Sequence, residues 1–267
     1  MVNVIISGCM GRMGKNIVQL AHKDSNIKIT GATEMSGSRY IGMSLSNSFG
    51  IENENVKITD DLSSIINKAD CIIEFTNPEA TMLSLKTAVK NNKGIVIGTT
   101  GLNSSQIKEI ENAAREIPIV FAPNMSVGIN LLFDKIGEIA KKLSDYDIEI
   151  IEVHHKFKKD APSGTAKKFA EIIAKATGAD LEKNAVYGRE GKDALRKPKE
   201  IGIHAVRAGD IVGEHTIIFS NEGERIEIAH KAHSRDAFAS GAIKAVKFLS
   251  KKKKGFYTMH DVLEALS

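Results

Sequence analysis

The residues best suited to chemistry lie in one basic segment, residues 152–166. Two adjacent histidines, His154 and His155, and three lysines follow a predicted strand, and Ser163–Thr165 then open a helical pattern. Imidazoles and lysines carry protons and attract anions, and the unpaired N–H groups and dipole of a helix start favour a carboxylate or phosphate. A basic run by itself is more often a solvated turn with a helix cap. The predicted elements around this segment are therefore needed to choose between an anion-binding site and a solvated turn.

Composition indicates an ordinary globular protein. The 267 residues can form one large or two ordinary domains, and 42% hydrophobic against 26% charged residues excludes disordered and fibrous classes. The formal net charge is +4, but the lysines are spread along the chain, only 5% of residues are aromatic and Trp is absent. A nucleic-acid site needs clustered basic residues and stacking aromatics. We therefore expect no nucleic-acid partner, whereas an anionic small substrate fits the charge.

The two cysteines and the N-terminal residues indicate the cellular compartment of the protein. Cys9 and Cys71 lie in or beside apolar runs, without the spacing of metal ligands. We expect buried, reduced thiols and no bound metal. The start Met1–Val4 lacks the basic and apolar regions of a signal peptide, and no window reaches the apolar length of a membrane span. The sequence thus predicts a cytoplasmic protein with no membrane partner.

A glycine-rich turn follows the first predicted strand, Val2–Ser7. It reads Gly8-x-x-Gly11-x-x-Gly14 and leads into a predicted helix over 15–23, with Arg12 and Met13 inside the turn. Such glycines allow a tight turn and a close backbone approach to a pyrophosphate at the helix N-terminus. Glycine turns between strand and helix are common, so this pattern alone is a weak indication of a dinucleotide site.

An acidic residue strengthens the indication. Glu34 ends a second predicted strand, Ile27–Thr33, and lies 20 positions after Gly14, where a Rossmann fold holds the adenosine ribose hydroxyls. The alternative is an exposed carboxylate at a strand end. Met35 follows, where an arginine would clamp the 2′-phosphate of NADP. NADH is therefore favoured over NADPH, although Arg12 or Arg39 could reach a phosphate.

Strands and helices continue to alternate through the first half. Further strands are predicted at 56–59, 69–76, 94–101 and 117–121, and helices from Pro78 and over 104–115. This alternation implies right-handed crossovers and an α/β fold with a Rossmann-type doubly wound parallel sheet.

Small polar residues follow three of these strands. They are Thr76-Asn77, Gly98-Thr99-Thr100-Gly101 and Ala122-Pro123-Asn124, the last followed by Met125. Each set could be an ordinary strand-exit turn. Because ligands bind such sheets beyond the carboxyl ends of the strands, the three sets together predict the floor under a nicotinamide ring.

The pattern changes after residue 125. Predicted there are helices over 126–143, 164–177, 237–251 and 261–266, and strands over 147–155, 201–207, 214–220 and 225–230. Residues 221–223 have the composition of a hairpin turn. This part is therefore an α+β segment with a mixed sheet, and Lys251–Lys254 is expected to be a solvated loop. We expect a dinucleotide-binding domain at 1–125, a second domain at 126–235, and C-terminal helices at 236–267 that return to the first domain.

Several motifs resemble those of the dihydrodipicolinate reductase family of the bacterial diaminopimelate and lysine pathway. They are the Gly8–Gly14 turn, Gly98–Gly101, Ala122–Ser126, Val206–His215 and, above all, Glu152-x-His154-His155-x-x-Lys158-x-Asp160-Ala161-Pro162-Ser163-Gly164-Thr165. The resemblance spans almost the whole chain. The last block is highly specific, whereas the glycine turn is shared by many dehydrogenases.

The resemblance implies roles by position. His154 would be the catalytic acid and Lys158 its partner, and substrate carboxylates would be held by His155, Ser163, Gly164 and Thr165. The cofactor, NADH or NADPH, would be lined by Gly8, Arg12, Met13, Glu34, Gly98, Thr100, Ala122 and Met125. The family also implies a homotetramer built through the sheet of the second, substrate-binding domain. Phe157 stands where the family often has histidine, and neither it nor Arg189 or Arg196 receives a role.

The implied reaction is hydride transfer from nicotinamide C4 to a conjugated C=C–C=N ring. His154 would deliver the proton and Lys158 would stabilise the developing negative charge. The substrate would be 4-hydroxy-tetrahydrodipicolinate and the product tetrahydrodipicolinate. Two alternatives remain open at this point, namely another amino-acid dehydrogenase, such as a homoserine or aspartate dehydrogenase, and a non-catalytic regulator that senses a dinucleotide.

Overall fold

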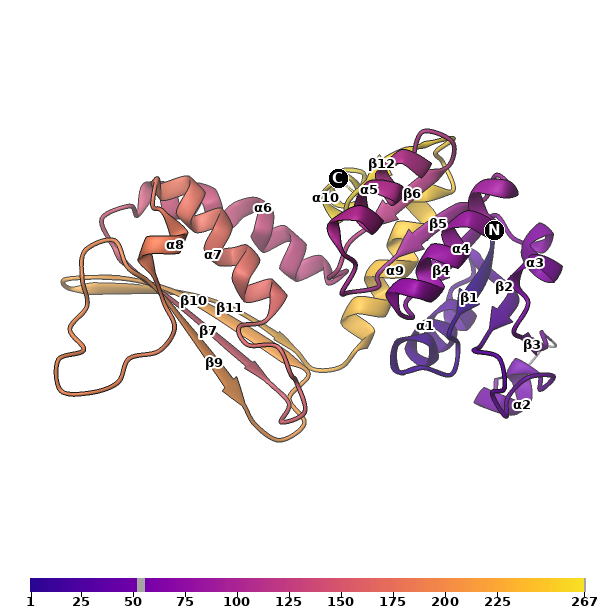
Figure 1. Ribbon diagram of the computed structural model, residues 1–267, viewed down its shortest axis with the longest axis horizontal. Helices are drawn as coiled ribbons and strands as arrows, with labels where there is room; N and C mark the ends of the chain where they lie inside the picture. Colours follow the sequence, from indigo (N-terminus) through magenta and orange to yellow (C-terminus); the bar gives the residue numbers. More distant parts are fainter. Residues whose placement is uncertain (52–55, 267) are drawn as a thin grey trace. The chain divides into compact units, whose positions relative to one another are not determined.

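The computed structural model describes residues 1–51 and 56–266, which form two compact units (Figure 1). The first unit contains Met1–Val127 together with the C-terminal segment from Arg235, and the second contains Gly128–Ser234. Within the described part of the chain, no helix is long and apolar enough to cross a membrane.

The first unit is built on a seven-stranded parallel sheet, in the order β12-β6-β5-β4-β1-β2-β3. Its strands are β1 (Val2–Ser7), β2 (Ile27–Thr33), β3 (Ile58–Thr59), β4 (Cys71–Glu74), β5 (Gly94–Ile97), β6 (Pro118–Phe121) and β12 (Gly255–Tyr257). The chain builds outward from β1 through β2 to β3, and then restarts at β4 on the other side of β1. The strand order therefore reverses between β1 and β4, which is where doubly wound sheets bind ligands. The predicted Rossmann-type sheet is confirmed.

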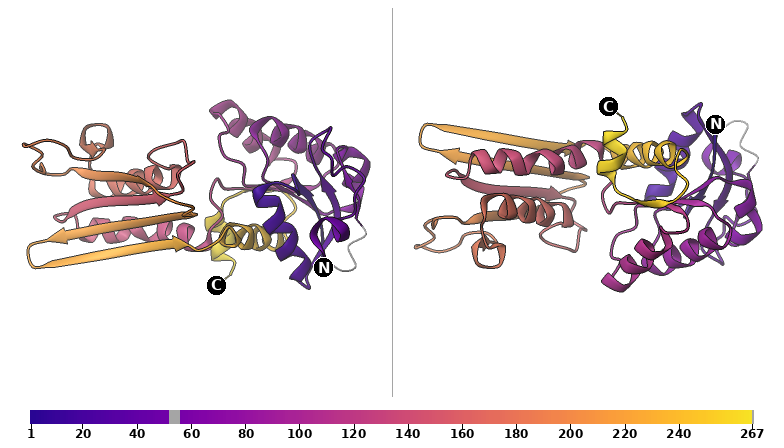
Figure 2. Two further views of the ribbon diagram at one scale, coloured as in Figure 1. Left: turned by 90° about the horizontal axis from the view of Figure 1, so that it is seen from below. Right: turned by 90° about the horizontal axis from the view of Figure 1, so that it is seen from above.

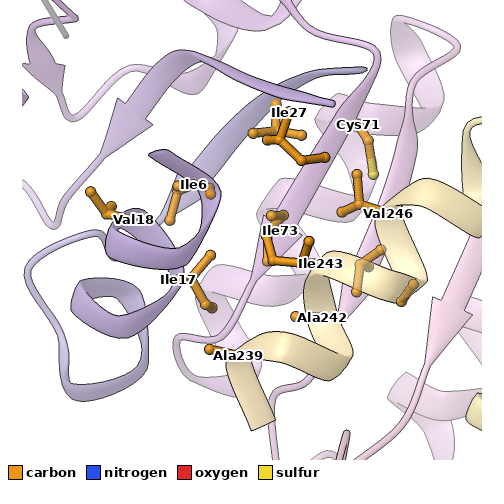
Figure 3. Packing of buried hydrophobic residues seen from close by; sticks show 14 of the residues in the cluster. Ile6, Ile17, Val18, Ile27, Cys71, Ile73, Ala239, Ala242, Ile243 and Val246 are labelled. Atoms are coloured by element: carbon orange, nitrogen blue, oxygen red, sulfur yellow. The ribbon is translucent and has the colours of Figure 1, made fainter. Parts of the chain in front are cut away.

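Helices cover both faces of this sheet. They are α1 (Arg12–Lys23), α4 (Pro78–Lys90), α5 (Ser104–Ala113), α9 (Asp236–Leu249), α10 (Met259–Glu264), the short α2 (Leu45–Phe49) and α3 (Leu62–Ile65), and a 3-10 turn over Ile66–Lys68. On one face, Ile17 of α1 and Ile243 of α9 pack on Ile6 and Ile73 (Figure 3). Strands buried on both faces explain the nearly continuous apolar runs in the sequence.

The C-terminal helix α9 belongs to the core of the first unit. A Cβ on Gly241 would lie only 1.7 Å from the carbonyl oxygen of Met125, so glycine lets α9 approach the segment that follows β6. The Lys247 ammonium also forms a 2.5 Å ion pair with Asp24 after α1. Helix α9 therefore packs against the segment after β6 and is also tied to the end of α1.

Some boundaries differ from the predictions. Helix α1 begins at Arg12 and not at Lys15, because the glycine turn passes directly into helix. The strand predicted over 56–59 is limited to Ile58–Thr59. Strand β12 was not predicted, since three residues are too few to show an alternating pattern.

The second unit has a five-stranded mixed sheet, in the order β11-β10-β7-β9-β8. The strands are β7 (Asp147–His154), β8 (Ala185–Val186), β9 (Ile201–Arg207), β10 (Gly213–Asn221) and β11 (Glu224–Ala232). Strands β7 and β9 are parallel, whereas β10 runs antiparallel to β7 and β11. The predicted mixed sheet is confirmed.

Two long helices, α6 (Val127–Lys142) and α7 (Gly164–Thr177), cover one face of this sheet (Figure 2), and α8 (Leu181–Asn184) follows α7. Ile136 of α6 and Phe169 of α7 are fully buried against Ile150 of β7 and Phe219 of β10. Alternate residues of β7 point to the helices, so Glu152 and His154 share a face with Ile148 and Ile150. The strand pattern therefore brings polar groups next to the start of α7.

Candidate active site

The turn between β1 and α1 has room for backbone alone. Gly8 adopts a φ of +63°, and its carbonyl accepts the Gly11 N–H at 2.9 Å. A Cβ on Gly14 would lie 2.1 Å from the Gly8 carbonyl oxygen, so a side chain there would displace the turn. Gly11 caps α1 without a side-chain hydrogen bond, which leaves the first helical N–H groups to another acceptor. This arrangement fits a pyrophosphate at the N-terminus of α1.

Glu34 is attached to the same turn. One carboxylate oxygen accepts the Met10 N–H at 2.9 Å, and the other accepts the Met35 N–H at 3.1 Å. Met35 is 74% exposed, and the Arg39 guanidinium donates to the Tyr40 hydroxyl at 2.8 Å. The end of β2 therefore presents a fixed carboxylate beside the glycine turn.

The polar strand exits have distinct surroundings. Thr99 is buried and forms a 2.8 Å hydroxyl hydrogen bond with Thr81 of α4, whereas Thr100 is exposed. A Cβ on Gly98 would collide with the Phe75 ring. After β6, the Asn124 side chain accepts the Ser126 N–H at 2.9 Å.

Burial also separates the other predicted cofactor residues at these exits. Ala122 and Met125 are buried, while Pro123 is exposed. The predicted cofactor residues at the strand exits are therefore of two kinds. Thr99, Ala122 and Met125 are buried and support the strand ends, whereas Thr100 and Pro123 are exposed.

A buried carboxyl at the end of β4 was not predicted as part of this site. Glu74 is fully buried and pairs in register with Ser7 of β1. It accepts the Thr76 N–H at 3.1 Å and also the Thr76 hydroxyl, and the Thr76 methyl packs against Gly8. Burial raises the pKa of Glu74 above its usual value, against the hydrogen bonds from Thr76. Glu74 therefore braces the strand exit that packs on the glycine turn.

In the second unit, Glu152 is the centre of a polar cluster. Its fully buried carboxylate lies 2.5 Å from Nδ1 of His154. It also accepts hydrogen bonds from both terminal nitrogens of Arg207, each at 2.8 Å. It also accepts the Ser163 N–H at 3.0 Å. Burial alone would raise the pKa of Glu152, but the hydrogen bonds from His154, Arg207 and Ser163 outweigh it and lower the pKa to about 2. Glu152 is therefore ionised at neutral pH.

Lys158 lies on the loop after β7. Its ammonium forms a 2.8 Å ion pair with Asp160, and the lysine side chain is 21% exposed. The Asp160 carbonyl accepts a 2.6 Å hydrogen bond from Arg207, which ties this loop to the cluster around Glu152. Lys158 is thus held near the end of β7 but remains accessible.

The start of α7 is held by the buried Ser163 side chain, whereas Gly164 is exposed to solvent. The Ser163 hydroxyl is buried, accepts the Ala166 N–H at 3.2 Å and lies 3.1 Å from Nε2 of His215. Gly164 is exposed, and a Cβ there would meet no atom within 4 Å. Thr165 is half-buried, so the first turn of α7 can present its backbone to an anion.

His215 of β10 completes the support. Burial, followed by repulsion from His154, lowers the pKa of His215 to about 3, so this histidine is neutral. Its ring lies edge-on to the His154 ring, with 5.2 Å between centroids. His155 is half-buried, whereas the neighbouring Phe157 is 76% exposed and has no contact that suggests a role.

The structure adds Glu152, Arg207 and His215 to the predicted site residues. Glu152 and His154 are two positions apart, which puts them on one face of β7. Arg207 pairs with His154 in the parallel β7–β9 register, and His215 pairs with Glu152 in the antiparallel β7–β10 register. The first relation could be seen in the sequence, but the other two depend on strand order.

Arg189 and Arg196 lie elsewhere on the second sheet. Arg189 and Arg196 both contact Glu149, and Arg196 also forms a 2.7 Å ion pair with Asp147. Glu149 points to the face of β7 away from α7. These arginines therefore attach the irregular segment before β9 to the sheet and do not join the cluster around His154.

A doubly wound sheet with a glycine turn at its reversal point, and a second unit with a histidine beside a helix start, fit a two-domain NAD(P)H-dependent oxidoreductase. Residues 2–125 match the family model of the dihydrodipicolinate reductase N-terminus, and residues 128–263 match that of its C-terminus. The chain belongs to the dihydrodipicolinate reductase family. It is an enzyme of diaminopimelate and lysine biosynthesis that reduces dihydrodipicolinate.

Solved structures agree with this assignment. A dihydrodipicolinate reductase from Paenisporosarcina sp. TG-14, solved with dipicolinate bound, has 26% identity and a TM-score of 0.78, with 98% of this chain and 100% of that chain covered. An amine dehydrogenase from Mycobacterium smegmatis (11% identity, TM-score 0.58, coverage 97% and 95%) shares the fold alone. So does a probable dehydrogenase from Thermotoga maritima (13%, 0.59, 99% and 93%).

Proposed function

We propose that the chain reduces 4-hydroxy-tetrahydrodipicolinate to tetrahydrodipicolinate with NADH as the favoured donor. The observation that carries this proposal is the grouping of His154 and the open start of α7 around the buried Glu152 carboxylate, with Lys158 on a loop that Asp160 and Arg207 tie to the same cluster. A proton donor next to a cation and an anion-binding helix start suits a ring that bears carboxylates and accepts a hydride. A dicarboxylate ligand is further supported by the dipicolinate named for the related structure.

In the proposed reaction, each site residue of the second unit has its own role. His154 supplies the proton, and Lys158 leaves Asp160 to stabilise negative charge on the reacting ring or to pair with a carboxylate. Gly164 and Thr165 bind a carboxylate through the first turn of α7, with Ser163 fixing that turn from inside. His155 assists at the carboxylates.

The first unit holds the dinucleotide. Its glycine turn, with Gly8, Gly11 and Gly14, fits the pyrophosphate, and Arg12 and Met13 begin α1 beside it. Glu34 takes the adenosine ribose hydroxyls and disfavours a 2′-phosphate through its charge. The strand exits at Gly98–Thr100 and Ala122–Met125 line the nicotinamide. The bound cofactor supplies the hydride.

A substrate panel tests this assignment against its rivals. NADH consumption should require the condensation product of pyruvate and aspartate semialdehyde, and homoserine and aspartate should support no NAD⁺ reduction. Turnover of either amino acid alone would favour an amino-acid dehydrogenase. Salt-sensitive DNA binding without any turnover would favour a dinucleotide-sensing regulator.

We also propose a homotetramer assembled through the second sheet. The face of this sheet away from α6 and α7 carries half-exposed Ile151, Val153 and Ile218 and exposed Val206. An apolar sheet face of this kind is commonly covered by another subunit. Light scattering should give the mass of four chains, and a monomer mass at micromolar concentration would contradict the assembly. We place the enzyme in the cytoplasm, where reduced thiols such as buried Cys9 and Cys71 persist.

A further inference from the structure

The cluster around Glu152 joins groups that the proposed reaction uses for different purposes. One carboxylate contacts Nδ1 of His154, the N–H of Ser163 and the guanidinium of Arg207. We propose that Glu152 is a positioning residue, which aims Nε2 of His154 at the substrate and fixes the anion-binding start of α7 in the same frame. This inference rests on the proposed function, because it assigns a task to the residue that holds the proposed acid.

Charge on Glu152 decides which nitrogen of His154 carries the proton. Glu152 is fully buried and ionised, so both of its oxygens accept hydrogen bonds and neither donates one. Nδ1 of His154, at 2.5 Å from the carboxylate, must therefore keep its hydrogen in both the neutral and the cationic ring. Nε2 carries the proton only in the cation, and it is the atom from which His154 can release a proton.

The space around Nε2 is kept open by a glycine. A Cβ on Gly213 would lie 3.0 Å from Nε2 and 3.3 Å from Cδ2 of His154, which is closer than most real Cβ contacts. The His215 ring, edge-on to His154, limits rotation from the other side. The ring is thus oriented by Glu152 at Nδ1 and confined by Gly213 and His215.

Arg207 balances the charge of the cluster. An isolated glutamate beside His154 would hold the imidazolium strongly and oppose proton release. The guanidinium of Arg207 shares both oxygens of that glutamate, so part of the negative charge is already compensated. Neutral His215 on β10 faces His154, and the Lys158–Asp160 ion pair lies on the loop that follows β7. His230 of β11 adds a further interaction with His215.

The substrate first loses its hydroxyl and a hydrogen of the neighbouring ring carbon as water, which leaves the conjugated C=C–C=N ring. That ring then gains a hydride with its two electrons from NADH, which becomes NAD⁺. The N–H bond at Nε2 of His154 breaks, its electron pair stays on Nε2, and the proton forms a new bond at the ring atom that develops negative charge. The Nδ1–H bond remains intact throughout, so Glu152 is ionised before and after the step.

If the buried Glu152–Arg207 pair had only a structural role, removing it would lower the stability of the protein but would leave the tautomer of His154 unchanged. The decisive measurement is ¹⁵N NMR of the His154 side chain in the wild-type protein without substrate, recorded while the ring is neutral. We expect the Nδ1–H tautomer with an unprotonated Nε2. A neutral ring that carries its hydrogen on Nε2 would overturn the proposal, even if no variant could be purified.

Variants then connect the tautomer to turnover. Glu152→Gln should convert part of the ring to the other tautomer, lower kcat by at least about tenfold, and move the high-pH limb of the kcat/KM profile to lower pH, since the imidazolium loses its carboxylate. Glu149→Gln is the matched control, because Glu149 lies on the same strand and also bridges a histidine and arginines. It should leave the His154 signals and the pH profile unchanged. Equal pH profiles for Glu152→Gln and wild type would refute the positioning role.

Gly213→Ala provides a variant that keeps Glu152 and Arg207. It should lower kcat by crowding Nε2 while the ring retains its Nδ1–H tautomer. If the wild-type enzyme shows that tautomer but does not reduce the proposed substrate, the proposed function fails and the Glu152–His154 relation stands. An unchanged kcat in Gly213→Ala would contradict the assignment of Nε2 as the proton-releasing atom.

Discussion

The Glu34 carboxylate accepts a 2.9 Å hydrogen bond from the backbone N–H of Met10, which anchors the acid at the end of β2 to the glycine turn after β1. The carboxylate cannot turn away from a bound dinucleotide without breaking this bond and the one from Met35. Its negative charge is therefore fixed at the position where the proposed function places the adenosine ribose.

The cofactor preference follows from this charge. We expect kcat/KM for NADH to exceed that for NADPH, since a 2′-phosphate would meet the Glu34 carboxylate. Glu34→Gln should reduce the NADH-to-NADPH ratio by about tenfold or more, which corresponds to about 1.4 kcal/mol. Glu116→Gln, an exposed site before β6, serves as the control. A strong NADPH preference in the wild-type enzyme would disprove the role of Glu34.

Gly164 offers a test of the anion site that leaves the fold alone. A Cβ at this position meets no atom within 4 Å, and the backbone is ordinary helix. Gly164→Ala should keep the melting temperature and NADH affinity of the wild type, but raise KM for the substrate by about tenfold if a carboxylate rests on this turn. Gly14→Ala, whose Cβ would collide with the Gly8 carbonyl, should instead weaken NADH binding. An unaltered KM in Gly164→Ala would remove the first turn of α7 from the substrate site.

Glu74 should make stability depend on pH. Burial raises its pKa in the folded state, so the folded protein binds the proton more tightly than the unfolded chain. The contribution of this carboxyl to stability is full below its unfolded pKa and is lost as pH rises through its folded pKa. The free energy of unfolding of Glu74→Gln should therefore increase relative to wild type as the pH rises above the usual glutamate value of 4.5, by about 1.4 kcal/mol for each unit of pKa shift. Urea unfolding measures this, with Glu111→Gln on the exposed side of α5 as the control. A difference that is constant with pH would show that Glu74 does not titrate in this range.

Much of the fold could be predicted from the sequence because its signals are local. The glycine turn after β1, the hairpin over 221–223 and the bounds of α7 follow from turn residues and periodicity within short windows. Strand β12 could not be predicted, since its three residues gain their strand conformation by pairing with β6.

The candidate site likewise combines residues that the sequence indicated with residues that only the strand order brings together. His154, Lys158 and Ser163–Thr165 are close in sequence. Their types were compatible with proton transfer and anion binding, and the family resemblance assigned their individual roles. Arg207 and His215 join His154 through the order β10-β7-β9, a long-range property of the sheet. The burial of Glu152, which makes it the centre of the cluster, also depends on packing against α7.

We propose that His154 supplies the proton and Lys158 stabilises the negative charge when 4-hydroxy-tetrahydrodipicolinate is reduced. The most direct measurement is the rate of NADH oxidation supplied with the condensation product of pyruvate and aspartate semialdehyde, for wild type, His154→Ala and Lys158→Ala. If this assignment is correct, we expect substrate-dependent NADH oxidation by the wild type and a loss of about 100-fold or more in kcat for His154→Ala. The kcat of Lys158→Ala should also fall, and the NADH affinity of both variants should stay within about twofold of wild type. Near wild-type turnover in both variants would contradict it.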